Sequence, residues 1–198
     1  MAVREIVSPL IPEVSRSLKA GDMVNLSGRI VTARDQVHRY LAAGGKPPVD
    51  LEGLVIYHCG PVVIRKGGSW QVLAAGPTTS IREEPYEAGI IRSYHPVAVM
   101  GKGGMGAKTA EALQTEGCVY LHLTGGAASS IAGSIECVEG VHLLEFGQPE
   151  ALWIFHVRSL SALVTMDSYG NSLHRDIESS SLEVFRQLLK TPFREEKS

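Results

Sequence analysis

Cysteine is scarce in this sequence, and its spacing excludes several kinds of protein. The 198 residues contain three cysteines, Cys59, Cys118 and Cys137, and no two of them lie close together in the chain. An odd, low count without paired spacing is typical of reduced thiols in a reducing compartment, and the spacing does not match a set of metal ligands. We therefore interpret each cysteine as a small buried hydrophobic residue and predict that this chain alone holds no metal.

Long apolar runs and a large net charge are also missing. No segment approaches the ~18 apolar residues that a membrane span needs, and residues 1–22 lack the apolar core of a secretory signal. The formal net charge is -2, so bulk attraction to nucleic acid is not expected. We expect a cytoplasmic globular protein without a membrane or nucleic-acid partner, in which a few placed cations bind any anion.

The first part of the chain has the pattern of β-structure with one helix. Residues 1–22 contain two prolines, which favours an extended arm that ends in a turn. Residues 23–35 alternate polar and apolar side chains, as a strand does, and residues 34–45 have apolar positions at helical spacing before a glycine stop. Residues 53–77 predict short strands separated by glycine turns, with a hairpin tip at 65–70.

From residue 71 onward, strand and helix patterns alternate. This alternation predicts parallel strands joined by right-handed crossovers, and therefore an α/β fold. The predicted elements are strands at 71–76, 97–101 and 118–126, helices at 82–93, 107–117 and 127–135, β segments at 141–146, 151–157 and 162–173 with a turn at 169–171, and a helix at 181–189. We predict three parts, namely an arm at 1–22, a main domain at 23–175 and a charged tail at 176–198.

Three glycine-rich loops follow predicted strands, at 76–80, 101–106 and 124–130. In an open parallel sheet, the loops at the carboxyl ends of the strands meet at one edge, where ligands bind. Backbone amides and helix N-termini at that edge attract anions. Glycine is also common in tight turns that bind no ligand. The presence of Thr78 and Lys102 in two of the loops favours a binding site.

The loop GKGGMG at 101–106 resembles two nucleotide-binding motifs and fails the requirements of both. A P-loop needs a lysine directly after its last glycine, but Ala107 stands there and Lys108 comes one residue late. The dinucleotide pattern G-x-G-x-x-G is present, but it also needs an acidic residue about 20 positions later. The strand predicted at 118–126 ends without one. A small carboxylate is therefore the favoured anion.

Two arginines lie beside these loops, and arginine binds carboxylates through two parallel hydrogen bonds. Arg82 comes four residues after Thr78, and Arg34 lies in the segment VTARD. Lys102 adds a point charge. Any one arginine could be a solvated surface side chain, and Arg34 beside Asp35 could form a plain ion pair. The placement of Arg82 and Lys102 in two crevice loops makes them the stronger candidates.

Several motifs, in order, resemble the β-type half of the class I iron–sulfur hydro-lyases, which are the class I fumarate hydratases and the L-tartrate dehydratases. The resemblance covers roughly residues 5–175, and its motifs are SGRIVTARDQVHR, IYHCGPVV, GPTTSIREEPY, GKGGMG, FGQPEALWIFHV and DSYGNSL. It implies a swivelling β/β/α domain, with parallel βα crossovers and additional β segments, that closes over the substrate. It also implies a partner α subunit that carries a [4Fe-4S] cluster, in a heterotetramer of two α and two β chains.

Residue by residue, the resemblance implies that Arg34, Arg82 and Lys102 bind a dicarboxylate substrate and that Thr78 transfers a proton. The implied reaction is the reversible hydration of fumarate to L-malate, a step of the tricarboxylic acid cycle, in an enzyme that is active only with the α subunit. Dehydration of L-tartrate is the alternative reaction. A non-catalytic carboxylate-binding or assembly module is the alternative of another class.

The proton-transfer role of Thr78 needs support, because a bare hydroxyl is a poor proton acceptor. A neighbouring base or a water relay would be required. His38, His58 and His95 are candidate helpers, although each of them more often has a structural role than a catalytic one.

Overall fold

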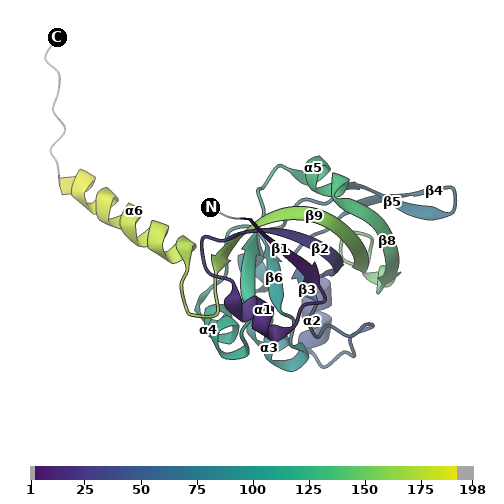
Figure 1. Cartoon of the computed structure of the whole chain (residues 1–198), viewed down its shortest axis with the longest axis horizontal. Helices are drawn as coiled ribbons and strands as arrows, with labels where there is room; N and C mark the ends of the chain where they lie inside the picture. The colour runs from purple at the N-terminus through teal and green to yellow at the C-terminus, as the bar shows by residue number, and fades with distance from the viewer. Residues whose placement is uncertain (1–2, 191–198) are drawn as a thin grey trace, which may run out of the picture.

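The computed structural model describes residues 3–190, and its main feature is a mixed β-sheet that closes into a ring (Figure 1). The strands of this sheet are β1 (Val3–Ser8), β2 (Met23–Thr32), β3 (Val55–Tyr57), β6 (Ala98–Gly101), β7 (Val119–His122), β8 (Ile135–His142) and β9 (Leu152–Met166). Five of them pair in the order β2, β3, β6, β7, β9, and the ring closes because β9 also pairs with β2. β1 extends the ring beside β2, and β8 extends it beside β9.

Helices cover the ring on one side, and a small hairpin with one short helix lies on the other (Figure 1). The helices are α1 (Pro12–Ser17), α2 (Asp35–Ala42), α3 (Glu84–Tyr94), α4 (Ala107–Glu116), α5 (Ala128–Gly133) and α6 (Leu173–Lys190), with 3-10 turns η1 (Ser80–Glu83) and η2 (Leu144–Phe146). α1 to α4 form the covering layer, and α5 lies near the separate hairpin of β4 (Val62–Lys66) and β5 (Ser69–Ala74). The main body is a mixed α/β fold.

The parallel strands are buried on both faces. In β3, Val55 and Tyr57 join the apolar cluster inside the ring, while Ile56 joins the cluster against α2. In β6, Met100 points inward and Val99 packs toward α3 and α4. Successive side chains of a strand point to opposite faces, so burial of both faces requires a nearly continuous apolar run. The segments LVIY and VAVM have this pattern.

The strand–helix alternation predicted from residue 71 is confirmed for β6, α4 and β7, whose strands pair in parallel. The first strand of that prediction, β5, instead pairs antiparallel with β4. β2 and β3 join the parallel part of the sheet, with α2 between them and α3 between β3 and β6. Two predictions after β7 are wrong in detail. The segments 151–157 and 162–166 form one strand, β9, which is bent at Ser159 (φ 48°) and not broken there. The segment 141–146 leaves the sheet after His142, because Leu143 adopts a left-handed backbone (φ 56°).

Both ends of the described chain contain regular structure. β1 lies within the predicted arm and pairs in parallel with β2. The helix predicted at 181–189 starts earlier, at Leu173, where the Ser172 hydroxyl accepts a hydrogen bond from the amide of Arg175 (3.3 Å). The division into arm, domain and tail stays a prediction. None of the helices within residues 3–190 has the length and apolar character that a membrane crossing requires.

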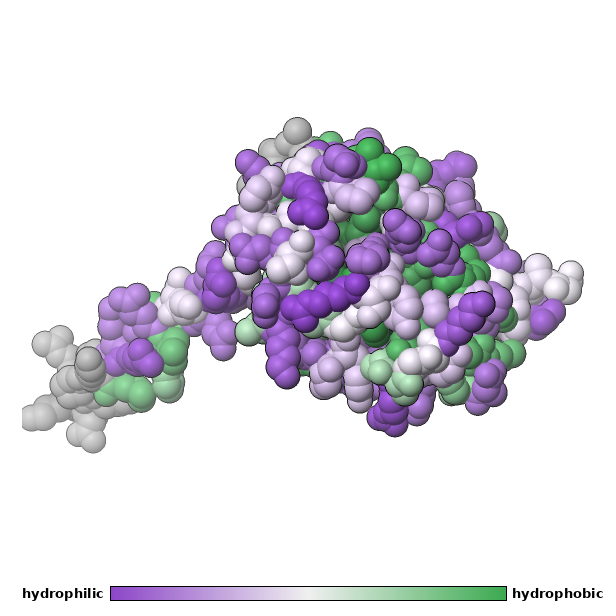
Figure 2. Space-filling model, turned by 90° about the horizontal axis from the view of Figure 1, so that it is seen from below, coloured by the Kyte–Doolittle hydropathy of each residue, from purple (hydrophilic) through white to green (hydrophobic). Residues whose placement is uncertain are grey.

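α6 extends away from the rest of the molecule (Figure 1). Its first turn is held by the His174 ring, which lies 2.9 Å from the Thr165 hydroxyl. Beyond that turn, large apolar side chains are exposed on the surface of the helix (Figure 2), and they are Ile177, Leu182, Val184, Phe185, Leu188 and Leu189.

Gly28 allows β1 to lie against β2, and its replacement tests the closeness of these strands. Its φ is +94°, and a Cβ atom placed on it would lie 2.1 Å from the Ser8 carbonyl oxygen. Gly21 also has a positive φ (+101°) but has open space around it. Gly21→Ala therefore adds backbone strain alone, about 1 kcal/mol, whereas Gly28→Ala adds a clash with backbone and is expected to cost about 2–3 kcal/mol. Urea unfolding of both variants measures the difference, and equal losses would contradict the close contact.

Candidate functional site

The loop at 76–80 lies across the ends of β3 and β6. The Thr78 amide donates a hydrogen bond to the His58 carbonyl (2.8 Å), and the Lys102 amide donates to the Thr78 carbonyl (3.2 Å). The Ser80 amide in turn donates to the Lys102 carbonyl (2.9 Å). The strand before this loop, β5, pairs with β4 and not with the ring. The prediction that all three glycine loops follow strands of one open parallel sheet is therefore wrong, but these bonds still place Thr78 next to Lys102.

The third glycine loop, at 124–130, also reaches this place. A Cβ atom placed on Gly125 would lie 3.4 Å from Cδ and 3.7 Å from Nζ of Lys102. The lysine side chain therefore lies along the bare backbone of Gly125, where a larger residue would crowd it. All three predicted loops meet at Lys102.

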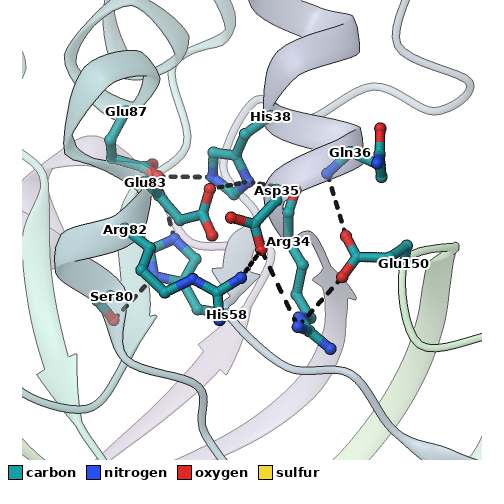
Figure 3. A network of polar contacts seen from close by, with 10 residues as sticks. All are labelled: Arg34, Asp35, Gln36, His38, His58, Ser80, Arg82, Glu83, Glu87 and Glu150. Atoms are coloured by element: carbon teal, nitrogen blue, oxygen red, sulfur yellow. Dashed lines mark hydrogen bonds and ion pairs between the residues drawn. The ribbon is translucent and has the colours of Figure 1, made fainter.

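The two candidate arginines come together around one carboxylate (Figure 3). Arg34 lies at the start of α2 and Arg82 in η1, and Asp35 pairs with Arg82 and lies 4.0 Å from the Arg34 guanidinium. Glu150 makes a second pair with Arg34, at 3.1 Å. Sequence reasoning considered Asp35 only as a partner of Arg34 and missed Glu150, which lies in the motif FGQPEALW. The two carboxylates hold the guanidinium groups in place before any ligand binds.

The N-terminus of α4 is already occupied by a carboxylate of the protein itself. Glu84, the first residue of α3, accepts hydrogen bonds from the amides of Gly106 (2.8 Å), Lys108 (3.0 Å) and Thr109 (3.3 Å). It also accepts a bond of 2.6 Å from the Thr109 hydroxyl. The prediction that this helix N-terminus faces a ligand crevice is therefore wrong, because the amides that would hold an anion are taken. The Lys102 side chain of the same loop forms none of these bonds with Glu84 and can still meet a ligand.

A chain of fully buried polar side chains lies next to the arginines, and Figure 3 shows its members His38, His58, Ser80 and Glu87. Glu87 Oε2 lies 2.7 Å from His38 Nε2 and 3.0 Å from His58 Nε2. The chain continues from His58 Nδ1 to the Ser80 hydroxyl (2.9 Å) and from there to the Tyr120 hydroxyl (2.7 Å). We call these five side chains the buried network, and they are His38, His58, Ser80, Glu87 and Tyr120.

The charges within the buried network follow from its contacts. Burial alone would lower the pKa of His38, but the charge and hydrogen bond of Glu87, with Glu83 nearby, raise this pKa to about 8. Burial alone would raise the pKa of Glu87, but the two imidazoles lower it to about 2. Burial lowers the pKa of His58. At neutral pH, His38 is therefore an imidazolium paired with the Glu87 carboxylate, and His58 is neutral.

Of the three candidate helpers, the structure brings two into this region. His38 and His58 belong to the buried network, whereas His95 is exposed and lies 3.6 Å from Glu116. Sequence reasoning missed Ser80, Glu87 and Tyr120. Ser80 stands two residues after Thr78 in the motif GPTTS, which was the available signal.

The cysteines do not form a cluster site in the part of the chain that the structure describes. Cys59 and Cys118 are buried, as predicted, and burial raises the pKa of the Cys59 thiol to about 12. Cys137 is exposed, so the prediction of burial is wrong for it. Within residues 3–190, the group of three side chains close enough to share a metal ion contains no cysteine and consists of His38, His58 and Glu87. An iron–sulfur cluster needs thiolate ligands, and these residues do not fit one.

Glu83 is a buried carboxylate whose titration can be measured. Among the described residues neither of its oxygens has a hydrogen-bond partner, although Oε2 lies 3.6 Å from His38 Nδ1. Burial raises its pKa from the usual 4.5 to about 7. A raised pKa means that folding favours the protonated acid over the ionised form. The stability that this preference gives the folded state is fully present below pH 4.5 and is lost as the pH rises through 7. Glu83→Gln cannot titrate. Its free energy of unfolding should therefore rise relative to wild type by up to about 3 kcal/mol between pH 4.5 and 7.5.

Urea unfolding at three pH values tests this expectation. Glu87 stays ionised across this window, whereas the Glu83 charge itself helps to raise the pKa of His38. The difference from wild type therefore reports the titration of Glu83 together with its effect on His38. A difference that is the same at every pH would show that Glu83 titrates normally.

A family model described as "Fumarase C-terminus" matches residues 4–177. The chain belongs to the fumarase C-terminus family. It is 38% identical over 170 residues to the L(+)-tartrate dehydratase subunit beta of Escherichia coli (strain K12), and the match covers 85% of each chain. It is also 38% identical over 180 residues to a protein of Methanocaldococcus jannaschii provisionally named L(+)-tartrate dehydratase subunit beta, with 88% of this chain and 92% of that protein covered.

Another relative is a longer protein. This fumarase C-terminus chain is 55% identical over 187 residues to a Geobacillus stearothermophilus protein provisionally named fumarate hydratase class I. The match covers 94% of this chain but 36% of that protein. The chain is thus homologous both to a part of a class I fumarate hydratase and to L-tartrate dehydratase β subunits.

Proposed function

We propose that this chain is the β subunit of a two-subunit class I hydro-lyase that interconverts fumarate and L-malate. The observation that supports the proposal is that four predicted site residues form two pairs in a member of this family. Arg34 and Arg82 gather around Asp35, and Thr78 is hydrogen-bonded through its backbone to Lys102. We further propose that the main body is the swivelling β/β/α domain of such enzymes, located in the cytoplasm.

In this proposal the cations bind and orient the substrate. Arg34 and Arg82 hold its carboxylates through paired hydrogen bonds, which the planar guanidinium group suits. Asp35 and Glu150 fix the guanidinium groups beforehand, so less conformational freedom is lost on binding. Lys102 lies beside Thr78 and offsets the negative charge that builds on a carboxylate when the neighbouring carbon loses its proton.

Thr78 moves the proton. In the direction of dehydration, the proton on the carbon next to a carboxylate passes to the Thr78 oxygen while the hydroxyl proton of Thr78 passes to a relay water, so the side chain stays neutral. The hydroxyl group leaves the adjacent carbon and takes up the relayed proton as water. The double bond of fumarate forms between these two carbons. A cluster held by a partner α subunit would supply Lewis-acid chemistry at the departing hydroxyl. We propose that this partner assembles with the chain as two α and two β subunits.

Dehydration of L-tartrate is the second candidate function. The Escherichia coli relative that carries this name matches along 85% of its own length, as a separate β subunit does. Fumarate and tartrate differ in hydroxyl groups, which an α subunit could contact as readily as this chain.

The test is activity of the assembled complex. The chain is co-expressed with a candidate α subunit from the same genome, purified without oxygen, and assayed with fumarate, L-malate and L-tartrate. Turnover of fumarate and malate supports the proposal, and turnover of tartrate alone supports the second candidate. A complex that binds dicarboxylates but turns over none of them would indicate a non-catalytic module. Failure of the two chains to co-purify would contradict the two-subunit proposal.

A further inference from the structure

We infer that the buried network positions the functional groups of the site. Ser80 and His58 hold the Thr78 loop in place, and His38 holds the backbone of Arg34. This inference rests on the proposed function for its meaning in catalysis, but the geometry that carries it does not depend on the substrate. The members of the network come from α2, the end of β3, η1, α3 and β7. These are the elements that hold or adjoin the site residues.

One assignment of protons satisfies every contact in the network. The Tyr120 hydroxyl donates to Ser80 Oγ, and the Ser80 hydroxyl donates to His58 Nδ1. His58 and His38 both donate from Nε2 to the same oxygen of Glu87. The remaining nitrogen, His38 Nδ1, donates to the Arg34 carbonyl (3.0 Å). Glu87 Oε1 has no hydrogen-bond partner among the described residues, whereas the links described above are all paired. These links hold their members in place, because breaking one leaves a further unpaired polar group away from water.

His58 holds the Thr78 loop at two points. Its carbonyl accepts the Thr78 amide, and its ring accepts the Ser80 hydroxyl. Gly101 closes the other side, since a Cβ atom placed there would lie 2.0 Å from Ser80 Oγ. The loop therefore has little freedom to move along β6. The Thr78 hydroxyl is placed by this support and not by a hydrogen bond of its own within the described residues.

His38 performs the corresponding task for Arg34. Arg34 stands just before α2 in an extended conformation (φ −130°, ψ −167°), and no side chain caps that helix end. His38 lies one helical turn later, and its Nδ1–H bonds the Arg34 carbonyl. Because Glu87 holds both histidines through one oxygen, the arginine and the threonine loop are tied to a common point on α3.

A metal ion is the rival occupant of this cluster. A tetrahedral zinc ion with bonds of ~2.0 Å separates its ligand atoms by about 3.3 Å. The distances from Glu87 Oε2 to the two histidine nitrogens are 2.7 and 3.0 Å, which are hydrogen-bond lengths. The geometry therefore favours direct hydrogen bonds.

The two ends of the network should give separate kinetic defects in the assembled complex. Ser80→Ala frees the Thr78 loop and should lower kcat at least about tenfold with KM within about twofold. His38→Gln removes the ring hydrogen bond to the Arg34 carbonyl but leaves the bond from the backbone amide of residue 38, and it should raise KM at least about fivefold with a smaller change in kcat. Tyr120→Phe keeps the Ser80–His58 bond and should lie between Ser80→Ala and wild type. If Ser80→Ala and His38→Gln change stability but leave kcat and KM per folded complex unchanged, the network is structural only and the inference is wrong.

A second measurement does not depend on turnover. It therefore distinguishes failure of this inference from failure of the proposed function. Hydrogen exchange of the Thr78 amide, followed in the full chain by NMR, should accelerate at least about tenfold in Ser80→Ala relative to amides of β8. Exchange equal to wild type would overturn the inference even if the enzyme is active. A complex inactive on all three substrates, with accelerated exchange, would refute the proposed function alone. Stoichiometric zinc in the purified chain, lost in His38→Gln, would replace the hydrogen-bonded network with a metal site.

Discussion

Lys102→Met is expected to lower kcat/KM of the two-subunit enzyme by tens to several hundred-fold. This corresponds to about 2–4 kcal/mol of transition-state stabilisation, the usual loss when one preorganised electrostatic contact is removed. Methionine keeps the length of the side chain and removes its charge. The fold should be unaffected, because Lys102 is only half-buried and its backbone bonds to Thr78 and Ser80 remain.

Lys108→Met is the matched control for this change. Lys108 lies in the first turn of α4, six residues further on, and is exposed. Lys108→Met removes the same charge from the neighbouring segment, so the kcat/KM of this variant should stay within about twofold of wild type. Equal losses in both variants would indicate a general charge effect, and unchanged turnover in Lys102→Met would remove this residue from the site. Glu84 occupies the α4 N-terminus, so the wild type should not bind labelled ATP or NAD. Neither variant should bind these nucleotides either.

Glu87→Gln is expected to lower the free energy of unfolding at pH 7 by about 3–5 kcal/mol, because it leaves a buried charge without its partner. In the wild type, Glu87 and His38 are both fully buried and 2.7 Å apart. A neutral amide cannot offset the imidazolium, and the remaining carboxylate, Glu83, is further away, at 3.6 Å from His38 Nδ1. His38 therefore loses its proton or the region opens. Guanidinium chloride unfolding of the full chain measures the loss.

Two further variants show whether the loss comes from the ion pair. Glu111→Gln removes a carboxylate that is 69% exposed and pairs with Arg92 at 3.7 Å, so it should change stability by less than about 0.5 kcal/mol. The double variant with His38→Gln and Glu87→Gln should lose less than the sum of the single losses, because both charges are then gone. Additive losses would mean that the two side chains contribute independently.

Local sequence patterns predicted the elements better than their arrangement. The helices of the central crossovers and the parallel strands between them follow from periodicity and glycine stops, which are local signals. Closure of the ring by β9 is not local, because it depends on pairing between β2 and a strand more than a hundred residues later. For the same reason, the separate pairing of β5 with β4 could not be read from the strand pattern of β5 alone.

In the candidate site too, local features could be predicted and contacts between distant residues could not. The sequence correctly placed the glycines of the loop at 101–106 between a strand and a helix. Two of them, Gly103 and Gly104, are needed for the turn itself, because their φ angles are +87° and +75°. The carboxylate that occupies the α4 N-terminus comes from the preceding helix, 22 residues from Gly106 in the chain. No spacing rule connects Glu84 to that loop. The contacts of Glu87 with two histidines likewise depend on the packing of α3 against its neighbours.

The projecting helix α6 has a consequence for how the molecule melts. Its apolar side chains, such as Ile177 (67% exposed) and Leu188 (65% exposed), gain no burial from the ring. A helix of this length without tertiary support is only marginally stable in water. In the free chain its circular dichroism signal should therefore fade gradually on warming, well before the cooperative unfolding of the ring. A chain shortened to end at residue 178 should keep the cooperative transition at the same temperature and lose only the gradual one.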